Sequence, residues 1–123
     1  MMKRVIEVSL INNTGLVLNI NDTKLKHGRY TEEPNKLIEP GQSLTFKATK
    51  QTGAAYGVTG SFNIAAEGGG LYVLDFNNPY SGDNQASLVY NDTVNLSSHI
   101  EYNSKGQPMK ITGDIPAMNF SKN

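Results

Sequence analysis

Hydrophobic and polar residues alternate along most of this chain, and a period of two is the pattern expected of a half-buried β-strand. Residues 3–20 contain two such runs, separated by an Asn- and Gly-rich segment at residues 12–15. Short Asn/Gly loops commonly join antiparallel neighbours. The sequence therefore predicts a β-hairpin over residues 3–20.

Further alternating runs predict strands at residues 42–49, 62–66, 71–76, 86–91, 94–102 and 109–115. The glycines of residues 67–70 separate two of these runs, so a second hairpin is expected there. Residues 24–34 are more polar and end in Pro34, which is typical of a short edge strand or an irregular crossing. After Pro116 a tail is expected, with Phe120 as a candidate to tuck back against the core.

No segment shows a sustained helical period, and turns recur every eight to twelve residues or so. These features favour an all-β protein, and 123 residues are enough for one core but too few for two. We expect a single-domain antiparallel β-sandwich that includes residues 1–123.

The charge pattern excludes two classes of function. Eleven basic and eleven acidic residues give a net charge of zero, and the lysines and arginines are scattered singly. The sequence therefore has no basic stripe for nucleic-acid binding or for adsorption to anionic membranes by charge.

The chain has no cysteine, which excludes disulfides and thiol chemistry. It also has no apolar signal segment or membrane-spanning stretch, so synthesis as a soluble cytoplasmic chain is expected.

Residues 71–84 hold the most apolar run and the most specific motif. The run ends at Asn77-Asn78-Pro79, and turn-forming residues follow, so Tyr80 is presented on a loop at the end of a strand. A tyrosine in this position either takes part in binding or packs down as a lid.

Catalytic and metal-binding motifs fail on spacing or on missing partners. The two histidines, His27 and His99, have no Gly-x-Ser-x-Gly elbow, so a hydrolase is only weakly supported. Oxygen ligands cluster after Asp75, but Tyr80 stands where a calcium loop needs Gly. We expect no enzymatic activity, no metal and no cofactor.

Exposed tyrosines are the remaining candidates for a functional site. Six tyrosines, including Tyr56 and Tyr80, cannot all be buried easily, because each buried phenol needs a hydrogen-bond partner. Tyrosines on Asn- and Ser-rich loops suit the recognition of sugars, lipid headgroups or proteins. Tyr72 and Tyr102 are expected to be ordinary sheet residues.

Four motifs in order resemble the aegerolysin family, and within it the small components of binary insecticidal crystal toxins of spore-forming bacteria. The motifs are RVIEV leading to NNTG at residues 4–15, GRY at 28–30, GVTGSF at 57–62 and LDFNNPYSGDN at 74–84. The resemblance implies a β-sandwich that binds membrane lipid, often sphingolipid, or a midgut receptor, and acts with a larger partner protein in pore formation. It also allows homo-oligomers on membranes, and storage as an inclusion or release by a non-classical route.

The resemblance implies that Arg29, Tyr30, Asp75, Phe76 and Tyr80 are candidates for recognition or partner contact. Tyr56, in the glycine-rich segment 51–60, is a further binding candidate. Aegerolysins more widely place Trp and often Cys in the loop that here holds Asn78-Pro79-Tyr80, and this chain has neither residue. The alternative to a toxin component is a non-lytic carbohydrate- or lipid-binding module. The amphipathic residues 3–20 suit either a membrane hairpin or a stable sandwich, and we favour the sandwich.

Overall fold

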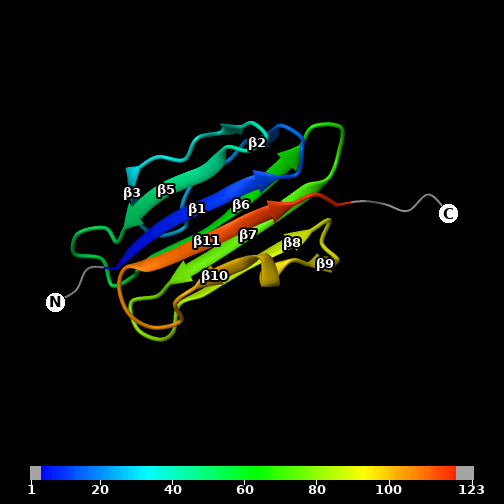
Figure 1. Cartoon of the computed structure of the whole chain (residues 1–123). Helices are drawn as coiled ribbons and strands as arrows, with labels where there is room; N and C mark the ends of the chain where they lie inside the picture. The colour runs from blue at the N-terminus through cyan, green and yellow to red at the C-terminus, as the bar shows by residue number, and fades with distance from the viewer. Residues whose placement is uncertain (1–3, 119–123) are drawn as a thin grey trace.

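The computed structural model describes residues 4–118, which form two β-sheets packed face to face (Figure 1). The five-stranded sheet has the order β10 (Ile100–Tyr102), β11 (Met109–Pro116), β1 (Val5–Asn13), β5 (Ser43–Thr49) and β3 (Arg29–Glu32). The six-stranded sheet has the order β4 (Leu37–Ile38), β2 (Leu18–Ile20), β6 (Val58–Ala66), β7 (Leu71–Asn78), β8 (Gln85–Tyr90) and β9 (Val94–Asn95). One turn of 3-10 helix, η1 (Ser97–His99), precedes β10. The predicted β-sandwich is confirmed. Phe120 lies outside the described residues.

The core lies between the sheets, because alternate residues of each strand point inward. Three phenylalanines form its centre, with ring centroids 4.9 Å apart for Phe46 and Phe62, 5.2 Å for Phe46 and Phe76, and 5.3 Å for Phe62 and Phe76. Each ring is at most 2% exposed. Burial of such side chains contributes roughly 2–3 kcal/mol each, which makes this cluster a main source of stability.

Several predicted elements are confirmed. The run at residues 71–76 is a strand at the middle of its sheet, and β6 and β7 form the predicted hairpin around residues 67–70. β3 is an edge strand, as the polarity of residues 24–34 indicated.

Tyr72 is buried, and its hydroxyl donates a hydrogen bond to the Pro116 carbonyl at 2.7 Å. Burial, together with the neighbouring Tyr90, raises the pKa of Tyr72 to about 12.

The predicted hairpin over residues 3–20 is wrong, because β1 and β2 belong to different sheets. The buried Asn12 side chain directs this crossing. Its Nδ2 donates to the Leu16 carbonyl at 2.8 Å and to the Ile38 carbonyl at 3.0 Å, so the end of β1 is held against the six-stranded sheet. Both strands bury alternate residues in the same core, which is why their pattern imitates a hairpin.

The predicted strand at residues 94–102 is wrong in its continuity, because η1 interrupts it and only β9 and β10 at its two ends are strands. Asn95 Oδ1 accepts a hydrogen bond from the Ser97 backbone N–H at 2.9 Å, and this side-chain turn ends β9 and leads into η1. The chain then enters the other sheet as β10, which pairs with β11. β11 in turn runs parallel to β1, the one departure among the named strands from the antiparallel pairing that was expected.

The outer face of the five-stranded sheet carries a ladder of alternating charges. Glu7 lies opposite Lys110 on β11 and Lys47 on β5, and Lys47 Nζ lies 3.9 Å from Glu32 on the edge strand. Neighbouring charges of opposite sign cancel over short distances. Each charge along this row therefore has a neighbour of opposite sign.

Asp114 on β11 connects three elements. Its carboxylate accepts a hydrogen bond from Asn13 Nδ2 of β1 at 3.0 Å and lies 2.9 Å from His99 Nδ1 of η1. Burial alone would raise the pKa of Asp114, but the hydrogen bonds from Asn13 and His99 outweigh it and the pKa is lowered.

Asn78, at the end of β7, fastens the two sheets together. Its Nδ2 donates to the Val5 carbonyl of the other sheet at 3.0 Å and to Gln107 Oε1 at 2.8 Å, while Gln107 Nε2 donates to Asn78 Oδ1 at 2.8 Å. The Asn78 side chain is fully buried and Gln107 is half-buried, so these bonds are partly shielded from water. We call this arrangement the amide clasp.

Asn78→Ala is expected to lower the free energy of unfolding by about 3 kcal/mol, because it removes three hydrogen bonds of a buried side chain and leaves the Val5 carbonyl and Gln107 Nε2 without their Asn78 partner. Urea unfolding measures the change. Asn63→Ala, at an exposed amide on β6, is the matched control and should change stability by less than about 0.5 kcal/mol. Equal effects of the two substitutions would contradict the clasp.

Asp114→Asn should destabilise the protein at neutral pH but not at low pH. A carboxyl whose pKa is lower in the folded state contributes stability above its unfolded-state pKa of about 4 and loses it as pH falls through the folded-state value. Urea midpoints of wild type and variant should therefore differ at pH 7 and converge near pH 2. The exposed turn variant Glu67→Gln provides the control. A difference that grows on acidification would refute the lowered pKa.

Candidate functional site

The loops between β5 and β6, between β7 and β8 and between β10 and β11 gather at one end of the sandwich (Figure 1). This end carries two exposed aromatic residues, Tyr56 and Tyr80, with 58% and 44% of their surface exposed. Arg4 and Lys50 lie beside Tyr80. We call these four residues the loop surface.

Two cations flank the ring of Tyr80. The Arg4 guanidinium carbon and Lys50 Nζ each lie 5.7 Å from the ring centroid, within cation–π range. Arg4 also holds the backbone of this loop, because its Nε donates to the Pro79 carbonyl at 3.0 Å and its guanidinium donates to the Tyr80 carbonyl. Tyr80 is thus fixed at its backbone while its ring remains partly exposed.

Tyr56 stacks on His27, with ring centroids 4.0 Å apart and planes 3° from parallel. The next residue, Gly57, allows the two tyrosine-bearing loops to touch, since a Cβ there would overlap the Asn78 carbonyl and the Pro79 backbone. Tyr56 and Tyr80 therefore stand on adjoining loops, each one residue from this contact.

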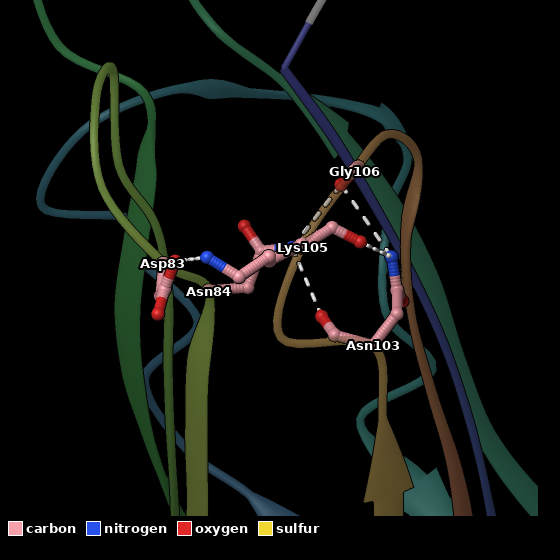
Figure 2. Close-up of polar contacts among 5 residues, drawn as sticks. All are labelled: Asp83, Asn84, Asn103, Lys105 and Gly106. Carbon is pink, nitrogen blue, oxygen red and sulfur yellow. Dashed lines mark hydrogen bonds and ion pairs between the residues drawn. The ribbon is translucent and has the colours of Figure 1, made fainter.

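The loop that carries Tyr80 is tied to the β10–β11 loop (Figure 2). Asn84 Nδ2 donates to the Asn103 carbonyl at 3.0 Å and to the Gly106 carbonyl at 3.1 Å, and Lys105 Nζ lies 3.1 Å from Asp83 Oδ1. Asp83 and Asn84, whose oxygens could suggest a calcium loop in the sequence, thus hold two loops together. A site built on loops fixed in this way loses little conformational entropy on binding.

An open groove with a volume of about 760 Å³ lies on the outer face of β6, β7 and β8. Asp75 lies in its middle, opposite Ser61 on β6 and Ser87 on β8. The remaining polar lining consists of Asp22, Lys24, Lys26, Thr59, Asn77, Gln85 and Tyr102. We call this feature the outer groove.

The six predicted site residues do not form one site. Tyr56 and Tyr80 share the loop surface, Asp75 lies in the outer groove, and Arg29 is exposed on the edge strand β3. Phe76 is 2% exposed and its ring belongs to the phenylalanine core, yet the residue also lines the outer groove, so its part in recognition stays a prediction.

Tyr30 is a half-buried packing residue. Its ring meets Phe46 edge to face at 5.9 Å, and its hydroxyl donates to the Thr23 carbonyl. Burial is the main reason that the pKa of the phenol is raised well above its ordinary value. Tyr30 therefore contributes to the packing of β3 on the core, and its hydroxyl already has a partner.

Sequence reasoning did not identify Arg4 and Lys50 as site residues. Arg4 is 76 residues from Tyr80 in the chain, and the two meet only because β1 begins where β7 ends, at the same end of the sandwich. Tyr102 was expected to be an ordinary sheet residue, yet it is 37% exposed and lines the outer groove. Which residues meet at the end of the sandwich or in the groove depends on where strands end and how they pair. The hydrophobic pattern of a single sequence does not specify either of these.

The two histidines are engaged in different parts of the molecule. His99 lies against Asp114 and His27 stacks on Tyr56.

Within residues 4–118, no helix has the length and apolar character that a bilayer span requires.

Comparison with known proteins shows similarity in structure alone, since no protein-family model and no curated protein sequence matches the chain. The lipid-binding protein Nakanori is 16% identical and superposes with a TM-score of 0.72, over 93% of this chain and 71% of that one. RahU, solved in complex with a TRIS molecule, is 16% identical with a TM-score of 0.71 over 98% of both chains. IP-1A from Alcaligenes faecalis is 18% identical with a TM-score of 0.63 over 90% of each. Nakanori and RahU have aegerolysin-type folds, so the β-sandwich that the sequence resemblance implied is confirmed.

Proposed function

We propose that this protein binds membrane lipid by docking its loop surface on the bilayer. The observation that carries the proposal is the position of Tyr56 and Tyr80, two exposed aromatic residues on adjoining loops, beside Arg4 and Lys50. The similarity in fold to the lipid-binding protein Nakanori supports it.

The chemistry of these residues suits the interface between lipid headgroups and acyl chains. A tyrosine ring is apolar over most of its area and has a polar hydroxyl at its tip, so it partitions into this zone. Cations close to the ring can contact the phosphate groups of lipids at the same depth. An approach along this end of the sandwich brings the tyrosines and the cations to the membrane together.

Other faces of the sandwich offer less to a membrane. The outer face of the five-stranded sheet alternates acidic and basic residues, as the pairing of Glu7 with Lys47 and Lys110 shows. Insertion of such a face would bury several charges, which is costly. The loop surface requires no such burial, and its loops are already fixed by the amide clasp and by the bonds of Asn84.

We also propose that binding serves a pore-forming, insecticidal binary toxin in which this chain is the small component and a larger protein completes the pore. Sphingolipid headgroups and a midgut receptor are the candidate targets, and recognition rather than catalysis is the proposed task. The order of the four aegerolysin-like motifs supports this role. Dye leakage from midgut-lipid vesicles should require both this protein and a larger partner toxin; absence of leakage with both would argue against the toxin role.

Tyr56→Ala and Tyr80→Ala should each weaken binding to vesicles of phosphatidylcholine and sphingomyelin about fivefold, because each removes about 1 kcal/mol of interfacial burial. Vesicle sedimentation across a lipid titration measures the affinity. The double variant should lose about 25-fold if the two rings insert independently.

Leu37→Ala is the matched control, since Leu37 is 56% exposed but lies on β4, opposite Asn19 and far from the loop surface. It should bind vesicles like wild type. Lipid docking through the loop surface is ruled out if wild type fails to bind, or if the folded tyrosine variants bind with unchanged affinity.

A further inference from the structure

The floor of the outer groove consists of two rows of polar side chains set by strand register. One row is Ser61, Asp75 and Ser87, and the other is Thr59, Asn77 and Gln85. Together they offer hydroxyl, amide and carboxylate groups, and so both donors and acceptors. Saccharide hydroxyls need this mixture, because each of them donates and accepts.

One contact fixes part of this floor in advance. Thr59 Oγ1 donates to Asn77 Oδ1 at 2.9 Å, which orients the Asn77 amide and directs its Nδ2 away from Thr59. Asn77 pairs with Thr59 and Gln85 across three adjacent strands, so these groups are held by strand pairing near one end of the sheet. Polar groups held on strands bind with better-defined geometry than groups on free loops.

The rims of the groove come from both sides of the sheet. On one side the chain before β3 runs along β6, where the Lys26 and His27 backbone N–H groups donate to the Thr59 carbonyl at 2.9 and 3.2 Å. On the other side stands Tyr102 from β10, with 37% of its surface exposed. An exposed tyrosine ring beside polar groups suits the apolar C–H face of a pyranose.

The charges of the groove select among saccharides. Lys24 and Lys26 bring two positive charges, and Asp22 and Asp75 bring two negative ones. A balanced lining gives no electrostatic advantage to an acidic ligand such as a sialylated or sulfated glycan. The loop surface differs, because Arg4 and Lys50 flank its ring.

We propose that the outer groove is a second binding site, which takes a neutral saccharide unit through Asp75, Asn77 and Gln85 and stacks it on Tyr102. This site goes beyond membrane docking and does not depend on it. Asn77 lies next to Asn78, whose carbonyl contacts Gly57 of the loop surface, so the groove opens close to the docking end. The saccharide can therefore belong to a free glycan or to a glycolipid headgroup.

An array of neutral, sialylated and sulfated glycans, probed with the full-length protein, tests the site. Wild type should bind neutral glycans, and Asp75→Ala and Tyr102→Ala should each weaken that binding about tenfold, the loss of roughly one good hydrogen-bonding or stacking contact. Thr45→Ala, on the outer face of β5, should leave it unchanged. Circular dichroism confirms that each variant folds.

Binding to no glycan, a preference for acidic glycans, or equal binding by the folded Asp75→Ala variant would each overturn the proposal. Phosphatidylcholine vesicles with and without a neutral hexosylceramide distinguish the two sources, and competition by the matching free oligosaccharide shows that the saccharide alone is recognised. Tyr80→Ala separates this site from lipid docking: it should weaken vesicle binding and leave free-glycan binding intact.

Discussion

The amide clasp between Asn78 and Gln107 is the interaction on which the candidate site depends. It joins the end of β7 to the Val5 carbonyl of the opposite sheet and to the β10–β11 loop at a fully buried position. A β-sandwich needs no polar contact between its sheets for stability, because hydrophobic burial supplies most of it. A buried and satisfied amide pair adds specificity instead, since any other alignment of the strands would leave it without partners. The Tyr80 loop begins directly after this fixed point.

The surface of the sandwich divides into regions of different chemistry. The outer face of the five-stranded sheet cancels its charges from strand to strand, as Glu7 and Lys47 illustrate. The outer face of β6 to β8 is hollowed and polar around Asp75. The loop surface combines aromatic rings with cations. The two sheet faces follow from alternation, since residues that point away from the shared core are free to differ between the faces, whereas the loop surface is made by residues between strands.

The sequence predicted much of the fold and only part of the site. Alternation identified β5 and β7 as strands. It also identified the β6–β7 hairpin, because these two neighbours in the chain are also neighbours in a sheet. It failed for β1 and β2, since a period of two says which residues are buried but not which sheet they belong to. Turn chemistry placed Tyr80 on a loop correctly. The contact of Arg4 with that loop spans 76 residues and depends on sheet order, for which local sequence has no signal. Phe76 and Tyr80 were equal candidates in the motif, and only their opposite burial separates them.

Tyr80→Trp tests lipid docking most directly, because the chain has no tryptophan and the variant gives a single fluorescent probe at the loop surface. Its emission should be quenched strongly by vesicle lipids brominated close to the headgroup and weakly by lipids brominated near the bilayer centre. A tryptophan at Leu37, far from these loops, should not be quenched. If Leu37→Trp is quenched and Tyr80→Trp is not, the protein meets the membrane through another surface and the account is wrong.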